Sequence, residues 1–240
     1  MKKLIEGIRR FKAIVRPEYV KYEGEMREFD YSERNCAVLS VIQNNYLKSQ
    51  DGYWIHKSSL LDYNLLGILL TNSKTVCDVG GGLASAFYQL KGLVNIDYTL
   101  IERDKVINRL DVSGFLVENN LSCIGKKKYD AILMGSSFQY ISAHLSLESI
   151  VSSSMKVIIL QRTPFFNAKE TTKCIQITRR TAERQSNVVT IWNYNDFVTQ
   201  MLSFGFKLAS KDISVEGRTY LKEGLRTFKV TYLNLMFVKK

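Results

Sequence analysis

The chain is poor in proline, histidine and cysteine. Its 240 residues include two prolines, two histidines and four cysteines. The prolines, Pro17 and Pro164, stand far apart, and no Gly/Ser-rich stretch has the composition of a flexible linker. The cysteines are widely spaced without a C-x-x-C pair, and only His56 and His144 accompany them. These absences exclude a small disulfide scaffold and predict no metal site, no redox motif and free thiols in a reducing compartment.

Long hydrophobic runs are absent as well. No stretch approaches the roughly 18 apolar residues that span a bilayer, and residues 1–10 lack the hydrophobic centre and cleavage site of a signal peptide. With 45% hydrophobic and 24% charged residues, the composition suits a globular domain and excludes a disordered chain. We therefore expect a cytoplasmic protein.

The positive charge is concentrated at the two ends of the chain. The net charge is +11; residues 1–16 hold six Lys or Arg against one Glu, and residues 205–240 hold eight against three acidic residues. Such ends attract anionic lipid, nucleic acid or an acidic substrate. Composition alone leaves these three alternatives open.

Residues 1–61 are predicted to form an N-terminal helical extension. Leu4, Ile8 and Phe11 recur at helical spacing, and a second helical stretch is expected over residues 32–48. The first helix has two interpretations. It either lies on the anionic surface of the inner membrane as a basic amphipathic helix, or packs against the rest of the protein or a second subunit.

From residue 62 onward the pattern changes to short apolar runs that alternate with helical segments. This alternation is typical of βαβ units and of a parallel sheet covered by helices on both faces. The predicted strands are residues 75–79, 97–101, 121–124, 131–134 and 157–160.

The last third of the chain departs from that alternation. A helix over 195–203 leads to a strand that starts within 204–208, a polar stretch around 216–218 and a final strand over 226–239. Strands this close have no crossover helix between them and pair antiparallel. We predict an α/β domain over residues 62–240, with a doubly wound, Rossmann-like, mostly parallel sheet that ends in a C-terminal antiparallel hairpin.

Three consecutive glycines follow the first predicted strand. They are Gly80, Gly81 and Gly82. Glycine is needed where the backbone turns tightly and a ligand approaches it closely. The NAD fingerprint G-x-G-x-x-G requires a glycine where this chain has Ser85. The pattern that is present, from Asp78 to Ala84, is D-x-G-x-G-x-A.

An acidic residue ends the second predicted strand. Glu102 lies 22 positions after Gly80 and precedes Arg103. A carboxylate at this place accepts hydrogen bonds from both ribose hydroxyls of an adenosine ligand. The alternative is a solvated residue that pairs with Arg103 or Lys105.

These motifs resemble those of class I S-adenosylmethionine (SAM) methyltransferases. The family's first motif is D/E-x-G-x-G-x-G, with Ala84 here in place of the last glycine. Residues 129–141 resemble its fourth motif, but residues 135–138 are Gly-Ser-Ser-Phe, not the N/D-P-P-Y/F of amino-methylating families. The resemblance implies SAM as cofactor and S-adenosylhomocysteine (SAH) as product. The implied cofactor-binding residues are Asp78, Gly80, Gly81, Gly82, Glu102, Arg103, Gly135 and Ser136.

The order of four short segments resembles a narrower group, the methyltransferases encoded in bacterial lipopolysaccharide, O-antigen and capsule gene clusters. The segments are VGGGL, LIER, FQYI and QRTPF, and the resemblance covers residues 53–240. It implies O-methylation of a sugar hydroxyl in a surface polysaccharide. The alternatives are methylation of a small metabolite or of RNA, although no RNA-binding module is visible, and a non-catalytic methyltransferase-like scaffold.

The acceptor side offers fewer signals. A sugar hydroxyl is barely acidic, so we expect a general base, and His144 just beyond the fourth motif is the candidate, with His56 as its rival and a surface role as the alternative. Arg162, after the fifth strand, is predicted to grip a carboxylate or phosphate of an acidic acceptor, with an ordinary salt bridge as the equal alternative. Three aromatic residues form either a sugar-binding floor or core: Trp54, Tyr140 and Phe165.

Overall fold

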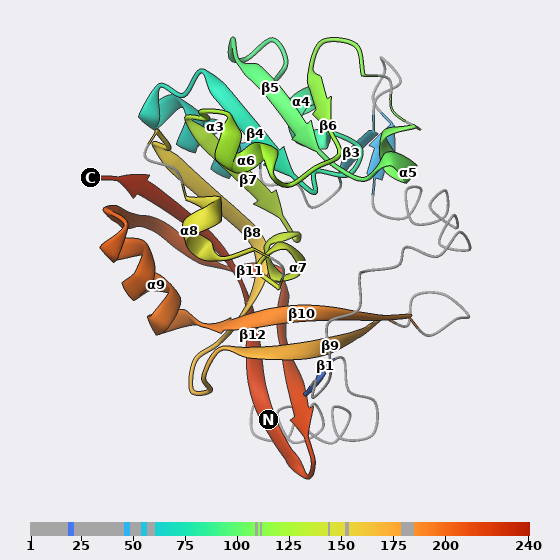
Figure 1. Cartoon of the computed structure of the whole chain (residues 1–240), viewed down its shortest axis with the longest axis vertical. Helices are drawn as coiled ribbons and strands as arrows, with labels where there is room; N and C mark the ends of the chain where they lie inside the picture. Colours follow the sequence, from blue (N-terminus) through green and yellow to red (C-terminus); the bar gives the residue numbers. More distant parts are fainter. Residues whose placement is uncertain are drawn as a thin grey trace.

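The computed structural model of the protein describes residues 19–21, 46–48, 54–56, 61–108, 110, 112–143, 145–151, 154–178 and 185–240 (Figure 1). The helices are α3 (Leu61–Thr71), α4 (Ser85–Leu90), α5 (Asp104–Ile107), α6 (Cys123–Lys126), α7 (Phe138–Ile141), α8 (Leu147–Ile150) and α9 (Tyr194–Ser203). The strands are β1 (Tyr19–Lys21), β2 (Tyr46–Lys48), β3 (Trp54–His56), β4 (Thr75–Val79), β5 (Asp97–Ile101), β6 (Leu116–Glu118), β7 (Ala131–Gly135), β8 (Val157–Phe166), β9 (Thr172–Thr178), β10 (Gln185–Asn193), β11 (Phe206–Glu223) and β12 (Arg226–Lys239).

Five parallel strands form the helix-covered half of the molecule. They follow the order β6-β5-β4-β7-β8, and every neighbouring pair is parallel. Successive residues of β4 point into the hydrophobic cores on opposite faces of the sheet. Val76 belongs to the same core as Phe87 of α4, and Cys77 belongs to the same core as Ile124 of α6. The predicted doubly wound α/β sheet is therefore confirmed for this half, including four of its five predicted strands.

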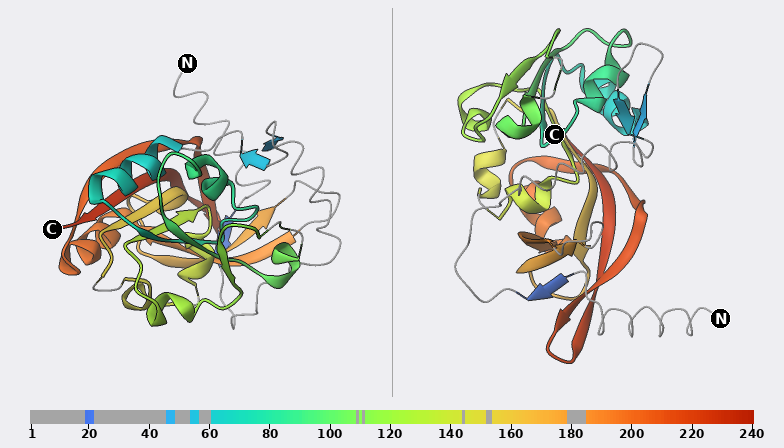
Figure 2. Two further views of the ribbon diagram at one scale, coloured as in Figure 1. Left: turned by 90° about the horizontal axis from the view of Figure 1, so that it is seen from above. Right: turned by 90° about the vertical axis from the view of Figure 1, so that its right-hand side faces the viewer.

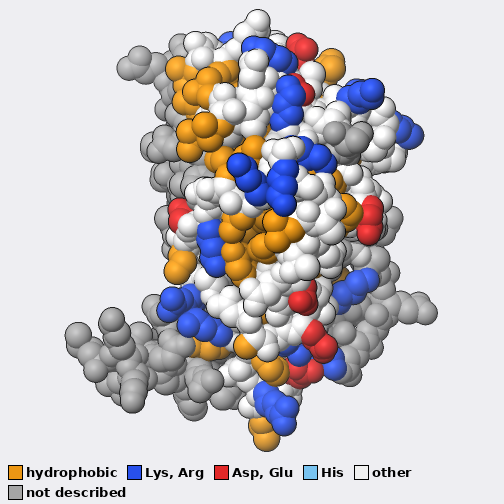
Figure 3. All heavy atoms as spheres, turned by 90° about the vertical axis from the view of Figure 1, so that its left-hand side faces the viewer, with side chains coloured by type: hydrophobic (Ala, Val, Ile, Leu, Met, Phe, Trp, Pro, Cys, Tyr) orange, Lys and Arg blue, Asp and Glu red, His pale blue; other side chains and the backbone are white. Residues whose placement is uncertain are grey.

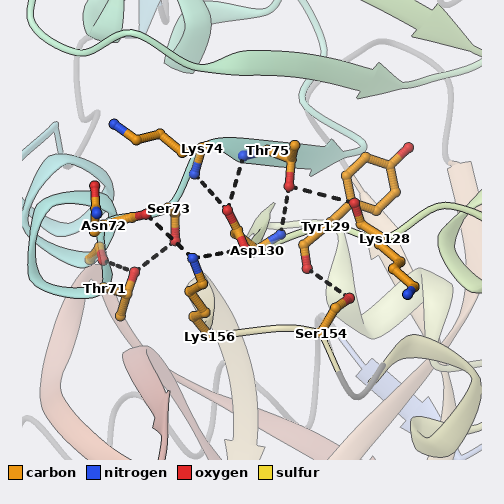
Figure 4. Close-up of polar contacts among 11 residues, drawn as sticks. Thr71, Asn72, Ser73, Lys74, Thr75, Lys128, Tyr129, Asp130, Ser154 and Lys156 are labelled. Carbon is orange, nitrogen blue, oxygen red and sulfur yellow. Dashed lines mark hydrogen bonds and ion pairs between the residues drawn. The ribbon is translucent and has the colours of Figure 1, made fainter.

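A carboxylate aligns the starting edges of three of these strands (Figure 4). Asp130, just before β7, accepts hydrogen bonds from the backbone N–H groups of Lys74 at 2.7 Å and Thr75 at 3.4 Å. Its other oxygen lies 3.0 Å from Nζ of Lys156, which precedes β8. Burial favours the neutral acid, but these contacts outweigh it and hold the pKa of Asp130 below its usual range.

The remaining strands close into a barrel. β8 continues past the parallel sheet and pairs in parallel with β10, which joins β9, β1, β11 and β12 before returning to β8. Figure 2 shows β8, β11 and β12 running from the helix-covered half into this barrel. Its core contains Tyr19 of β1, Phe166 of β8 and Val189 of β10. The sheet is thus mixed and partly closed, rather than a parallel sheet that simply ends in a hairpin.

The C-terminal pair β11–β12 is antiparallel, as predicted. The polar residues 216–218 do not end a strand. They lie at a bulge inside β11, where the pairing register shifts between Ile213 and Arg218. The reversal occurs at Gly224, whose φ of +58° suits glycine, and Leu225 at the tip is 93% exposed.

Two segments differ from the sequence-based expectation. The predicted strand over residues 121–124 is a turn followed by α6, which buries Ile124 on one helical face, while the edge strand β6 lies at Leu116–Glu118. Residues 46–48 form a strand paired with β3, not the end of a helix. Both errors arise in short apolar segments, where helix and strand periodicities are hard to distinguish. The predicted helix at the N-terminus lies outside the described residues.

The surface combines apolar and basic groups, and Figure 3 shows Lys and Arg between the hydrophobic side chains of one face. Leu66, Leu69 and Leu70 of α3 are 49%, 59% and 64% exposed. None of the described helices is long and apolar enough to cross a membrane.

Cys77 and Cys174 are buried free thiols. Burial raises the pKa of both thiols, that of Cys174 to about 12.

Candidate cofactor and acceptor site

The glycine turn connects β4 to α4 at the carboxyl edge of the parallel strands. Gly80 and Gly82 have φ of +69° and +60°, and Ala84 adopts the same left-handed region at +55°. A Cβ on Gly80 would lie 2.6 Å from Cβ of Ser137, and one on Gly81 would overlap the Asp78 carboxylate. The turn therefore requires glycine for close approach at both positions.

Asp78 is a buried carboxylate directly beneath this turn. Its side chain accepts a hydrogen bond from the Tyr98 hydroxyl on β5, and 4% of the residue is exposed. Burial raises the pKa of Asp78 to about 7; the nearby negative charge of Glu102 adds to this, and the Tyr98 hydrogen bond opposes it. A buried acid so close to neutral pH is typical of functional sites.

Glu102 ends β5 and reaches back to the glycine turn. Its carboxylate accepts hydrogen bonds from N–H of Gly82 at 3.0 Å and from N–H of Arg103 at 2.9 Å. Burial raises the pKa of Glu102, and the two backbone hydrogen bonds limit the rise. The alternative was a solvated Glu102 paired with Arg103 or Lys105; in the structure its carboxylate lies at the glycine turn.

The end of β7 is tied to both neighbouring strands. Ser136 adopts φ +64°, and its N–H donates to the carbonyl of Gln161 at 2.8 Å. The hydroxyl of Ser137 donates to the carbonyl of Val79 at the end of β4. These bonds hold the edges of β4, β7 and β8 together around the turn.

Two hollows open on either side of Gly80. The Glu102 hollow is lined by Val79, Gly80, Ile101, Glu102, Arg103, Asn119, Leu121, Ser136, Ser137, Tyr140 and Ile141. The Arg162 hollow is lined by Asn64, Asp78, Gly80, Gly81, Gly82, Ser85, Ala86, Gln89, Leu133, Met134, Gly135, Gln161 and Arg162. Together they form an extended site over the carboxyl edge, where open α/β sheets bind ligands.

Arg162 lies where β8 leaves the parallel sheet for the barrel. Its φ is +51°, its N–H donates to Oδ1 of Asn234 at 2.9 Å, and its Nε lies 4.0 Å from the Glu216 carboxylate. Beside it, Gln161 donates to Oδ1 of Asn64 at 2.9 Å, and both residues are buried.

The structure brings all eight predicted cofactor-binding residues, and Arg162, into these two hollows. Their roles stay predictions. His144 lies outside the described residues, and His56 and Trp54 are described only as part of the backbone of β3. Tyr140 lines the Glu102 hollow and donates a hydrogen bond to Gln176 of the barrel, whereas Phe165 is wholly buried core.

Several residues of the site were not predicted from the sequence. Tyr98 lies in the middle of β5, and its contact with Asp78 depends on the parallel pairing of β4 and β5. Asn64 belongs to a helix that precedes every recognised motif. Asn119 directly follows β6, which was placed too late in the sequence. Gln161 could have been predicted as a site residue, because it stands next to Arg162 after the fifth predicted strand.

The order of the parallel strands, the glycine turn after β4 and the Glu102 carboxylate at the end of β5 are those of the class I SAM-dependent methyltransferase fold. No protein-family model and no curated protein sequence matches the chain. Solved structures do match. Magnesium protoporphyrin IX methyltransferase (ChlM) from Synechocystis PCC 6803, solved with bound SAH, is 13% identical, with a TM-score of 0.50 and coverage of 98% of this chain and 94% of that chain. The N-terminal domain of EvdMO1, also with SAH bound, is 11% identical, with a TM-score of 0.50 and coverage of 98% and 97%. These neighbours support the predicted Rossmann-like α/β fold, whereas the closure of the sheet into a barrel was not predicted.

Proposed function

We propose that the protein is a SAM-dependent methyltransferase. The observation that carries the proposal is Glu102, held at the end of β5 by N–H of Gly82 and facing the hollow that it shares with Gly80. A carboxylate there suits the ribose diol, and a turn that excludes Cβ atoms at Gly80 and Gly81 lets a ligand approach the backbone. The residues therefore fit SAM.

SAM, when bound, supplies a methyl group activated by its sulfonium. The task left to the protein is mainly to hold cofactor and acceptor in a near-attack arrangement and to exclude water. The acceptor oxygen gains the methyl group and loses its proton, so the products are a methyl ether and SAH. The general base stays a prediction, with His144 and His56 as its candidates.

We further propose that the acceptor is a sugar hydroxyl of a bacterial surface polysaccharide. The sequence resemblance over residues 53–240 supports this substrate class, and residues 135–138 lack the motif of amino-methylating families. The basic ends fit an acidic glycan or one attached to the inner membrane surface. Methyl transfer from labelled SAM to polysaccharide fragments, small metabolites and RNA separates the alternatives, because transfer to RNA alone contradicts the proposal.

Calorimetry with SAH tests the cofactor. Glu102→Gln removes the charge that accepts both ribose hydroxyls, and we expect SAH affinity to fall by roughly 10-fold or more. The matched control is Glu118→Gln, because Glu118 ends the neighbouring strand β6 but pairs with Lys127 outside both hollows. Equal SAH affinity in wild type and Glu102→Gln removes Glu102 from the site, and stabilisation by NAD(H) without SAH binding overturns the proposal.

A further inference from the structure

The Arg162 hollow extends the site beyond the part that suits an adenosine. If the ribose binds at Glu102, as the proposed function requires, the rest of SAM crosses Gly80, which lines both hollows. That remaining part is an amino acid with an α-ammonium and an α-carboxylate. The Arg162 hollow must therefore accommodate a zwitterion.

The described lining of this hollow contains one cation and one acid, Arg162 and Asp78. The guanidinium of Arg162 reaches across to the end of β7, where its Nη2 lies 3.8 Å from the position that a Cβ on Gly135 would take. Its side chain is 18% exposed, so a carboxylate that meets it is largely withdrawn from water. A planar guanidinium binds a carboxylate through two parallel hydrogen bonds.

The backbone around Arg162 is irregular in three neighbouring strands. β8 and β12 lose register between Leu233 and Leu235, so that two residues of β8, Gln161 and Arg162, face the single residue Asn234. β11 bulges at nearly the same level, and this bulge contains Glu216. Bulges of this kind redirect a side chain, and they recur next to active sites.

Asn234 fixes the unusual conformation of Arg162. The φ of +51° is strained for a residue with a side chain, and it persists only where the surroundings enforce it. Asn234 is 2% exposed, and its Oδ1 accepts the hydrogen bond from N–H of Arg162. The Glu216 carboxylate, 4.0 Å from Nε, restrains the other end of the side chain.

We propose that Arg162 binds the α-carboxylate of SAM and SAH, and that Asn234 is the positioning residue that directs Arg162 into the hollow. This inference rests on the proposed function and deepens it. It reassigns Arg162 from the acceptor, where the sequence placed it, to the cofactor.

Calorimetry with two probes tests the assignment. SAH has the amino-acid end, whereas 5′-methylthioadenosine carries the same adenosine thioether without it. We expect Arg162→Gln to weaken SAH about 10- to 100-fold, the usual loss for a charge-assisted hydrogen bond, and to leave 5′-methylthioadenosine unchanged. Asn234→Leu, similar in shape but without an acceptor, should weaken SAH by about 10-fold with the same selectivity. Arg218→Gln, an exposed arginine of β11, is the control and should change neither affinity.

The two probes separate the outcomes. Binding of 5′-methylthioadenosine by each variant shows that its adenosine site is folded. Unchanged SAH affinity in Arg162→Gln, with a raised acceptor KM, returns Arg162 to the acceptor and overturns the inference. Equal losses for both probes give Arg162 a purely structural role and overturn it as well. If the wild type binds neither probe, the proposed function itself fails.

Discussion

At the scale of single residues, the site depends on how little room separates the glycine turn from Asp78. Gly81 lies so close to the Asp78 carboxylate that a methyl group has no place. The carboxylate is also fixed from the other side by the Tyr98 hydroxyl. Any side chain at residue 81 must therefore displace the turn.

We predict that Gly81→Ala lowers SAH affinity by at least about 10-fold, because a shift of the turn changes both hollows at once. Gly125→Ala is the matched control, since a Cβ there meets nothing within 4 Å and its φ is not positive. Isothermal titration of both variants with SAH measures the effect. Equal affinities would show that the turn adapts to a side chain.

Asp78 should also make stability depend on pH. Its folded pKa of about 7 lies above the unfolded value of about 4, so the folded state holds a proton that the unfolded state has released between these values. Stability is then fully present below about pH 4 and decreases as the pH rises toward 7, by at most about 1.4 kcal/mol per pH unit from this group.

Asp78→Asn isolates this contribution, because the amide cannot ionise and keeps an acceptor for the Tyr98 hydroxyl. Urea unfolding from pH 5 to pH 8 should show wild type losing more stability than the variant. The difference reports Asp78 together with its coupling to Glu102 and Tyr98, because both groups face its carboxyl group. Parallel stability curves would contradict the raised pKa.

At the scale of elements, Asp130 connects the starts of β4, β7 and β8. We predict that Asp130→Ala costs about 1–3 kcal/mol at pH 7, since it removes the charge-assisted hydrogen bonds from the N–H groups of Lys74 and Thr75. Asp130→Asn keeps an acceptor and loses only the contact with Lys156, whose side chain is 45% exposed, so it should cost less than about 1 kcal/mol.

The pH dependence of this cost has the opposite sign to that of Asp78. The folded pKa of Asp130 is lowered, so its stabilisation is present above about pH 4 and disappears as the pH falls through the folded pKa. The difference between wild type and Asp130→Ala in urea unfolding should shrink from pH 7 to pH 3. A constant difference would mean that packing, not the charge, accounts for the loss.

The elements that the sequence predicts well are those defined by local patterns. β4, β5 and β7 are short buried strands next to glycine, Glu102 and small residues, and their spacing identifies fold and site together. β9 and β10 were not predicted. They form a local antiparallel hairpin, but their place in the barrel depends on the pairing of β9 with β1, which lies far away in the sequence. The bulge at Asn234 is likewise invisible in the sequence, since it exists only when β8 and β12 are paired.

At the scale of the whole molecule, the two halves share strands. β8, β11 and β12 belong to both the helix-covered sheet and the barrel. The barrel also contains β1, which lies before the predicted domain boundary at 61/62. That boundary stays a prediction. A series of hydrogen bonds also connects the two halves. Tyr140 of α7 donates to Gln176, whose Nε2 lies 3.3 Å from the Tyr19 hydroxyl. The Tyr19 hydroxyl is in turn hydrogen-bonded to the hydroxyl of Tyr232.

We predict a single unfolding transition, and a loss of about 3 kcal/mol or more in Tyr19→Ala, because this wholly buried side chain leaves a cavity in the barrel. Far-UV circular dichroism reports the whole chain, and the fluorescence of the partly buried Trp192 reports β10. Their midpoints should coincide in wild type and fall together in the variant. Two separate transitions would show that the halves unfold independently.

The pairing of β1 also determines when the molecule can finish folding during synthesis. Tyr19 is translated early, but its partner in β11 is Leu221, near the other end of the chain. At about 5–20 residues per second, the ribosome needs on the order of ten seconds or more to supply that partner. During this interval β1 has no β11 edge to pair with, and the barrel cannot close. The late strand β11 therefore completes the pairing of the early strand β1, and a nascent chain that stalls before β11 exposes edges that other chains can capture.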